Sequence, residues 1–400
     1  MSIKNTRRWQ TLLIALVLIL VVVLPTMANI KYEYQFAQGY TDNLFMDNSK
    51  TEDYNTGNKL LLTYYPTNNI KIELQGYHTY YSKIYGLSNF AGSIDFTYLP
   101  LRKESPFSIL LNAKLKPTVY NQEKDEFNNN SMEFTIAGNF QADSVCQLRA
   151  GFSATANIYT NDNEAGYNTV SREFLYPSDH NIYKMYLGSN SQLGRNSSLD
   201  LEFGMVAMNL TYVFNPGNNP DIPFRDYLSV YYDTMEESHL LAYYISPRFS
   251  KLLGKKTGIS VTYTFRDFAF IKDVVLPGIS TGFLSPWANV YGGGALILSV
   301  KSFVVPNFIL SAGVGYFGKL YIPSEKNRVT DDVGIDIRYV IYQRHDRQTK
   351  TYLSIKRPIP FKSGLFMEPA LQINYNENKS NDPLYEYTAF SLTFGLTIRF

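Results

Sequence analysis

The chain has 400 residues, and its heavy use of Tyr (33) and Phe (26) favours strands over helices. A single Cys excludes a disulfide framework, a Cys-rich zinc site and an iron–sulfur cluster. The 37 Lys and Arg residues nearly balance the 35 Asp and Glu residues, which excludes a nucleic-acid binder that relies on a strong basic excess.

Residues 1–28 have the layout of a secretory signal peptide. Three basic residues precede position 9, an apolar run spans 12–24, and small residues stand at the two positions that a signal peptidase reads, Thr26 and Ala28. The run is shorter than the ~20 residues that cross a bilayer as a helix, which favours cleavage over retention as a membrane anchor. Polar residues interrupt every later apolar run. The mature chain, 29–400, is therefore expected to be a soluble secreted β-protein or a membrane β-barrel.

The end of the chain shows the clearest period-two pattern. Apolar residues occupy every second place from Phe390 to Phe400, and small or polar residues fill the places between them. A strand sends alternate side chains to opposite faces, so this segment is predicted to be a strand with one wholly apolar face. Its length matches the ~9–11 residues of a tilted membrane-crossing strand and exceeds the ~5–6 typical of globular sheets.

The same alternation recurs along the mature chain, at 30–36, 109–115, 134–141, 147–153, 199–205, 259–265 and 335–341. Export, long strands, a polar second face and the lack of helical punctuation together favour a membrane barrel over a soluble sandwich. The predicted fold is all-β: a transmembrane antiparallel up-and-down β-barrel. It must close, because an open sheet edge cannot satisfy its backbone groups in hydrocarbon.

The connections and the strand count follow the same reasoning. Tight turns are predicted at 65–69, 193–196, 253–256 and 305–307, and longer polar connections near 39–56, 121–130, 161–180, 215–235 and 272–284. About seventeen segments have the length of a tilted membrane strand; since single-chain bacterial barrels have even counts, about 16 strands are expected, with 14 or 18 as alternatives. The odd number of segments arises after residue 320, because 344–350 and 357–364 both have the composition of connections.

The strand that ends in Phe400 resembles the terminal strand of bacterial outer-membrane β-barrels. The early segment 39–45 (GYTDNLF) similarly resembles a motif near the first loop of outer-membrane porins. The resemblance implies that the barrel-assembly machinery reads the last strand, with Phe400, Ile398 and Leu396 as the assembly signal. It further implies periplasmic chaperones as partners and the outer membrane of a Gram-negative bacterium as the location.

Charged residues recur on the polar faces of the predicted strands. The candidates for lining the lumen are Lys31, Glu33, Lys71, Glu73, Asp95, Lys114, Lys116, Arg149, Asp200, Glu202, Asp336, Arg338, Lys356 and Arg399. Dry burial would cost several kcal/mol per ion unless each ion was paired, whereas a hydrated lumen avoids that cost. Opposite signs across the pore would screen each other and give little preference for anions or cations. The alternative is a paired network that only holds the barrel's shape.

The sequence predicts no enzymatic activity, no cofactor and no metal site. The four histidines lie far apart without metal-ligand spacing. His345-Asp346 with Asp331-Asp332 is similar to the acidic and Asp/His pairs of omptin-type outer-membrane proteases, but adjacent charges in a loop are more often solvated. Residues 161–164 (NDNE) offer oxygen ligands that suit calcium, against which a plain polar loop is favoured.

Two functions remain for such a barrel. The first, which is preferred, is a porin-like channel for the passive passage of small hydrophilic solutes. The second is a non-conducting structural or partner-binding barrel, for example an export or assembly component, whose lumen is plugged by loops 161–180 and 215–235. Outer-membrane lipid is an expected partner in both cases, and nucleic acid in neither.

Overall fold

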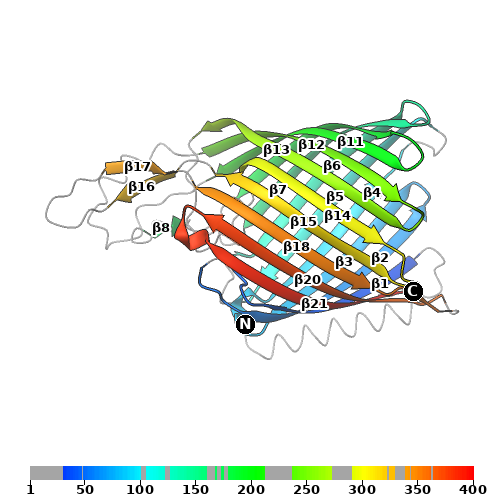
Figure 1. Ribbon diagram of the computed structural model, residues 1–400, viewed down its shortest axis with the longest axis horizontal. Helices are drawn as coiled ribbons and strands as arrows, with labels where there is room; N and C mark the ends of the chain where they lie inside the picture. The colour runs from blue at the N-terminus through cyan, green and yellow to red at the C-terminus, as the bar shows by residue number, and fades with distance from the viewer. Residues whose placement is uncertain are drawn as a thin grey trace.

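Sixteen antiparallel strands form the wall of one barrel in the computed structural model (Figure 1). The structure describes residues 30–46, 48–100, 105–121, 127–159, 167–168, 173–174, 179–211, 237–272, 291–321, 324–328, 338–342, 344–361 and 364–400. The wall strands are β1 (Ile30–Thr41), β2 (Asp53–Thr67), β3 (Ile70–Tyr81), β4 (Asn89–Tyr98), β5 (Phe107–Tyr120), β6 (Asn129–Gln141), β7 (Cys146–Tyr159), β10 (His180–Gln192), β11 (Ser197–Thr211), β12 (Glu237–Leu253), β13 (Thr257–Lys272), β14 (Gly292–Ser302), β15 (Ile309–Leu320), β18 (His345–Lys356), β20 (Phe366–Ser380) and β21 (Tyr387–Arg399).

The remaining described elements are short. β19 (Ile359–Pro360) adds two residues to the main sheet beside β20, while β8 (Tyr167–Asn168) pairs with β9 (Glu173–Phe174) and β16 (Ser324–Arg328) with β17 (Arg338–Tyr342). Two single-turn 3-10 helices, η1 (Tyr85–Leu87) and η6 (Pro383–Tyr385), lie in connections. Within the described ranges, no helix is long and apolar enough to cross a membrane.

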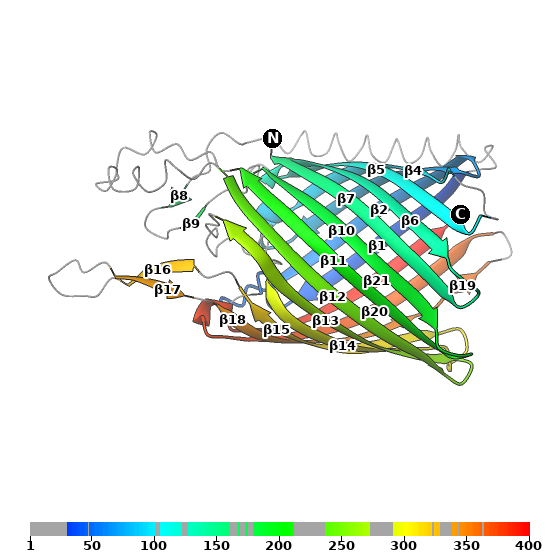
Figure 2. The same cartoon turned by 90° about the horizontal axis from the view of Figure 1, so that it is seen from above.

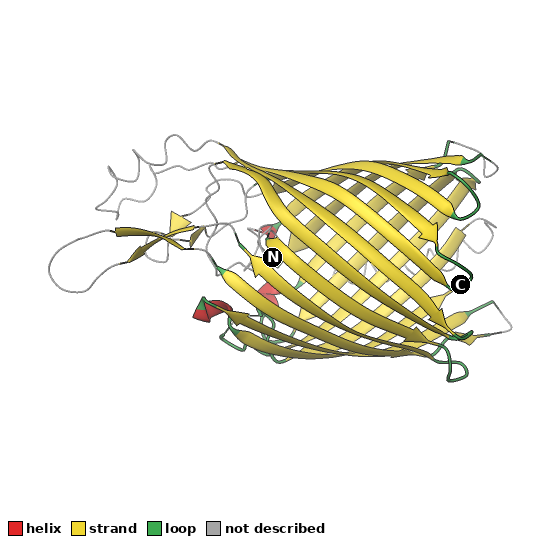
Figure 3. Cartoon of the chain, turned by 45° about the horizontal axis from the view of Figure 1, so that its top comes forward, coloured by secondary structure: helices red, strands yellow, loops and turns green. Residues whose placement is uncertain are grey.

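The barrel is closed by its first and last strands. β1 pairs with β21 in an unbroken antiparallel register from Glu33 opposite Arg399 to Thr41 opposite Ser391. Each of the remaining wall strands pairs with the wall strand before it and with the one after it in the chain. Figure 3 shows the strands tilted to the long axis of the barrel, as closure of a sheet requires. No wall strand is left with an open edge, so the predicted up-and-down barrel is confirmed.

Side chains alternate between the two faces of the wall. On β21, Phe390, Leu392 and Phe394 keep 37%, 39% and 47% of their surface exposed, whereas Tyr387 and Ala389, at alternate positions that face the other way, are buried. Large apolar side chains are exposed in the same way on strands all round the barrel. An apolar exterior of this extent is not stable in water and is the surface that lipid covers in a membrane barrel.

Connections at the two ends of the barrel differ in length. The short ones include residues 68–69, 193–196 and 254–256, where tight turns are predicted, and Gly194 and Gly254 adopt positive φ (139° and 68°), which a residue without Cβ adopts without steric cost. At the other end, residues 42–52 connect β1 to β2; this connection is shorter than the predicted 39–56, because both strands extend into that range. Most of 161–180, 215–235 and 272–284 lies outside the described residues.

The sequence interpretation is wrong in the region after residue 320. Residues 345–356 form the wall strand β18, although 344–350 has the composition of a connection. The outward positions of its first half are polar, among them Arg347 and Thr349, so periodicity does not mark the strand; it is held by its register with β15 and β20. In contrast, β17 pairs only with β16, and both lie beyond one end of the barrel (Figures 1 and 2).

Candidate functional site: the polar interior of the barrel

The inward face of the wall carries most of the charged residues singled out in the sequence. Where Leu201 and Phe203 of β11 are exposed on the outside (40% and 47%), Asp200 and Glu202 take the alternate, inward positions. By the same alternation, twelve of the fourteen predicted residues occupy inward positions on wall strands. Asp336 lies outside the described residues, and Arg338 belongs to β17, so Arg338 is not on a wall strand.

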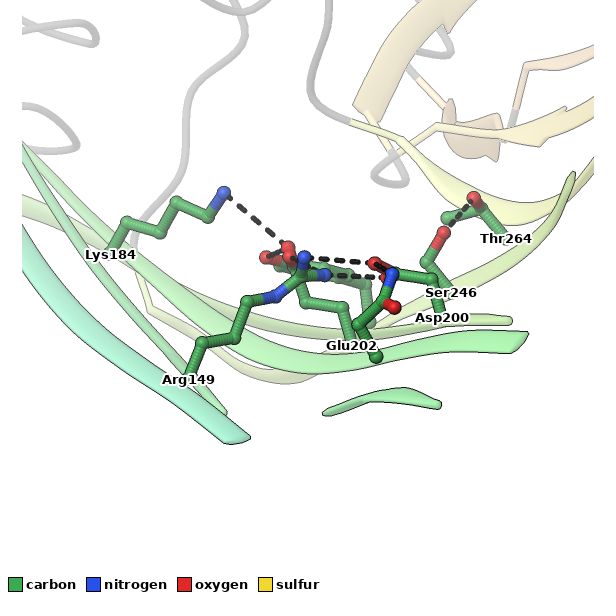
Figure 4. A network of polar contacts seen from close by, with 8 residues as sticks. Arg149, Lys184, Asp200, Glu202, Ser246 and Thr264 are labelled. Carbon is green, nitrogen blue, oxygen red and sulfur yellow. Dashed lines mark hydrogen bonds and ion pairs between the residues drawn. The ribbon is translucent and has the colours of Figure 1, made fainter. Parts of the chain in front are cut away.

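Arg149 is the centre of a network that joins β7 to β11 across β10 (Figure 4). Its Nη1 donates to Oδ2 of Asp200 (2.9 Å) and its Nη2 to Oδ1 (2.6 Å), a bidentate contact. Nη2 also donates to Oε2 of Glu202 at 3.0 Å. The intervening position on β10 is Gly188, where an added Cβ would lie 2.6 Å from Nε of Arg149. A planar guanidinium suits such a fork of carboxylates.

The network continues toward β12. Nζ of Lys184 lies 3.8 Å from Oε1 of Glu202, and the Tyr244 hydroxyl donates to the same oxygen at 2.6 Å. Lys184 is 5.4 Å from the ring centroids of both Tyr186 and Tyr244. Two positive and two negative charges therefore balance along this part of the wall. The sequence places Arg149, Asp200 and Glu202 on polar faces, and the strand register brings them into contact.

Glycines make room for the aromatic part of this network. The ring of Tyr186 lies over Gly151 of β7, and the ring of Tyr244 over Gly204 of β11; a Cβ would stand 2.4 Å and 2.3 Å from these rings. Each Tyr is directly opposite its Gly in the register. A ring can approach the backbone this closely only where the residue beneath it has no side chain. These Gly–Tyr pairs were not anticipated from the sequence.

Other predicted residues form smaller groups. Nε of Arg399 donates to Oε2 of Glu33 at 2.5 Å across the closing seam, and Lys71 is 2.9 Å from Glu73 on the same strand. Asp95 accepts a hydrogen bond from Asn112 at 2.6 Å.

The remaining four predicted residues are lysines in three kinds of surroundings. Two lie over aromatic rings, one faces a glutamate that was not predicted from the sequence, and one has no ion pair among the described residues. Lys31 and Lys116 lie over the rings of Tyr65 and Tyr77, 5.3 and 6.0 Å from their centroids. Lys356 faces Glu368 at 3.7 Å. Lys114 is opposite Asp95 in the register, but forms no ion pair within the described chain. Local pairs and isolated cations thus coexist on this interior.

A separate cluster lies at the rim with the longer connections. Arg344 stacks between Tyr321 and Tyr385, 4.0 and 3.2 Å from their ring centroids, and its Nε donates to Oδ1 of the buried Asp346 at 2.9 Å. Burial disfavours charge on Arg344, but the hydrogen bond and attraction from Asp346 outweigh it, so its pKa is raised. Burial also raises the pKa of Tyr385 to about 12. Tyr321 was not singled out in the sequence.

The rim cluster includes Asp346, one of the residues that resemble the acidic and Asp/His pairs of omptin-type proteases. Both oxygens of Asp346 are engaged by Arg344, and Oδ2 also accepts from Asn378 at 3.0 Å. Asp331, Asp332 and residues 161–164 lie outside the described residues. In the part of the chain that the structure describes, no three His, Cys, Asp or Glu side chains are grouped as metal ligands would be. Asp346 is therefore engaged in a structural ion pair.

No protein-family model and no curated protein matches the chain. Among solved structures, the barrel is similar to OccAB3 of Acinetobacter baumannii (10% identity, TM-score 0.44, 94% of this chain and 100% of that one) and to OccAB1 of the same species (8%, 0.45, 93% and 96%). It is also similar to OpdK of Pseudomonas aeruginosa, solved with vanillate (9%, 0.41, 93% and 99%).

The barrel itself determines the class of fold. A closed antiparallel cylinder of 16 strands, apolar outside and polar inside, with short connections at one end and longer ones at the other, is the architecture of a bacterial outer-membrane β-barrel. The resemblance noted in the terminal strand agrees with this architecture. Phe400 lies at the end of β21, 64% exposed on the outer surface.

Proposed function

We propose that this barrel is an outer-membrane channel through which small hydrophilic solutes pass passively. The observation that carries the proposal is the accessibility of charged side chains on the inward face. Lys184 and Lys356 keep 42% and 46% of their side-chain surface exposed, although both point into the barrel. In a dry core such groups would be buried and fully paired, at a cost of several kcal/mol per ion. Their exposure supports a hydrated interior.

The size of the barrel supports the same conclusion. Small barrels of about eight strands are filled by their own side chains, whereas ~16–18 strands leave an aqueous channel. The inward positions here carry many small residues, among them Ser260, Ser299, Ser311 and Gly313, which take up little of the space enclosed by the wall. Polar side chains of both signs then provide the hydrated surface along which a soluble solute diffuses.

Conductance of the purified mature chain in planar lipid bilayers tests the proposal. An open channel gives stepwise, steady currents that are proportional to voltage. A barrel that inserts but stays silent contradicts it. A variant without residues 161–178 and 215–235 then separates two causes of silence: currents in that variant alone indicate a plugged barrel, and silence in both proteins indicates a barrel without a pore.

A further inference from the structure

One sector of the interior is markedly basic. Strands β12, β13, β14, β15 and β18 follow one another around the wall. Their inward cations are Arg248, Arg266, Lys301, Lys319, Lys350 and Lys356. The one inward carboxylate described on these five strands is Asp346, which is bound by Arg344. The sequence predicted that opposite charges across the pore would screen each other, and the excess of one sign in this sector differs from that expectation.

A cavity of about 570 Å³ lies in this sector at the end with short turns. Arg248 and Lys301 line it from the wall, and Arg195 from the turn between β10 and β11. The polar lining is completed by Lys251, Tyr352, six serines and three amide side chains, and no carboxylate belongs to it among the described residues. Its volume is in the range of small-molecule sites, ~300–1,000 Å³.

Arg248 is available to a ligand because its neighbouring acid is engaged elsewhere. The register places Asp200 directly opposite Arg248. Both oxygens of Asp200 are held by Arg149 from the other side, however, and Oδ2 also accepts from Asn190 at 3.2 Å. Arg248 and Lys301 form no ion pair with any residue in the described ranges. The cavity therefore carries uncompensated positive charge.

The hydroxyl groups add donors without adding negative charge. Ser260 and Ser299 lie opposite each other on β13 and β14 with their oxygens 2.7 Å apart, so only one of the two hydrogens is used between them. Guanidinium, ammonium, amide and hydroxyl groups together offer many donors to a ligand that has only acceptors. Charge-assisted hydrogen bonds of this kind are the strong ones.

We propose that this cavity binds a small oxyanion: inorganic phosphate or sulfate, or the phosphate, sulfate or carboxylate group of a small solute. The inference rests on the proposed channel function only for the route by which the anion enters. In a conducting barrel, the same site would favour anions over cations on their way through the lumen.

Calorimetric titration of the detergent-solubilised mature chain with inorganic phosphate tests the site. The double variant Arg248→Gln, Lys301→Gln removes two cations from the lining, and its phosphate affinity is expected to fall about tenfold or more. The matched control is the double variant Lys59→Gln, Lys116→Gln. It removes two inward cations, Lys59 of β2 and Lys116 of β5, which both lie over the ring of Tyr77 and away from the cavity. Its affinity is expected to stay within about twofold.

Three results would overturn the site: no phosphate binding by the unchanged protein, equal affinity in the Arg248→Gln, Lys301→Gln variant, or an equal loss in the control. Binding is measured without current, so the two proposals fail separately. Phosphate binding by a silent barrel refutes the channel and leaves the site. Conductance in a protein that does not bind phosphate refutes the site and leaves the channel. Circular dichroism of each variant establishes that the barrel is folded.

Discussion

Arg149 holds both carboxylate oxygens of Asp200, at 2.9 and 2.6 Å, and so keeps this acid away from Arg248, which lies opposite it in the sheet. One ion pair on the wall thereby determines the charge of the neighbouring cavity. The two arginines lie on strands separated by β10 and β11, so this relationship depends on the register of four neighbouring strands.

The variant Arg149→Gln tests this relationship. Without the guanidinium, Asp200 and Glu202 lose their shared partner, and Asp200 becomes free to pair with Arg248. The expected result is weaker phosphate binding and a destabilisation of about 1–3 kcal/mol, since three charge-assisted hydrogen bonds between partly buried groups are lost. Phosphate titration and urea unfolding in lipid vesicles measure the two effects. Phosphate affinity equal to that of the unchanged protein would contradict the role given to Arg149.

The contact between Gly204 and Tyr244 predicts a steric effect. In Gly204→Val the new Cβ would stand 2.3 Å from the Tyr244 ring, so the ring must leave and its hydrogen bond to Glu202 is lost. A cost of about 1–3 kcal/mol is expected for overpacking of this kind. Gly76→Val is the matched control, because no atom lies within 4 Å of a Cβ at Gly76. Similar unfolding free energies for the two variants would refute the prediction.

The rim cluster is expected to depend on Asp346. In Asp346→Asn the stacked guanidinium of Arg344 loses its counter-ion while remaining largely buried. The expected destabilisation is about 2–4 kcal/mol, because breaking a buried ion pair leaves an uncompensated charge. Glu377→Gln removes an acid from the exposed pair with Lys379 and is expected to change stability by less than about 1 kcal/mol. Urea unfolding compares them, and equal losses would show that Asp346 has no special role.

The assembly signal inferred from the last strand gives a prediction in cells. Phe400 is exposed outside the barrel, and its side chain contributes little to the interior. Phe400→Ala is therefore expected to lower the amount of protein assembled in the outer membrane several-fold, while barrels refolded in detergent keep their unfolding midpoint. Outward Leu74→Ala is a control for the loss of apolar surface on the outer face. Unchanged assembly of the Phe400 variant would exclude the signal.

Strands with a regular period of two could be predicted from the sequence, and those without it could not. The alternation from Phe390 to Phe400 predicted β21 and its outward face correctly. The sequence predicted a connection for the first half of β18, because Arg347 and Thr349 stand where apolar residues were expected, and its position depends on pairing with β15 and β20. The hydrophobic period of a segment depends on which of its faces is apolar and can be read from the segment alone. Strand pairing depends on residues that are distant in the sequence, so it cannot be read from one segment.

The charged site was predictable in part. Alternation placed Arg149, Asp200 and Glu202 on polar faces, but the Arg149–Asp200 contact spans 51 residues and depends on register. Arg248 and Lys301 were missed. A usable signal existed, because successive strands of an up-and-down barrel are neighbours in space. Ordering the inward residues by strand would have shown that β12 to β18 carry cations with almost no acids.

A single-channel recording with a salt gradient across the bilayer tests the central claim, that water and small solutes fill the interior. The predicted result is a steady ohmic conductance whose reversal potential shows a preference for chloride over potassium, and a loss of that preference in the Arg248→Gln, Lys301→Gln variant. An inserted, folded barrel that carries no current, with or without residues 161–178 and 215–235, would contradict the claim.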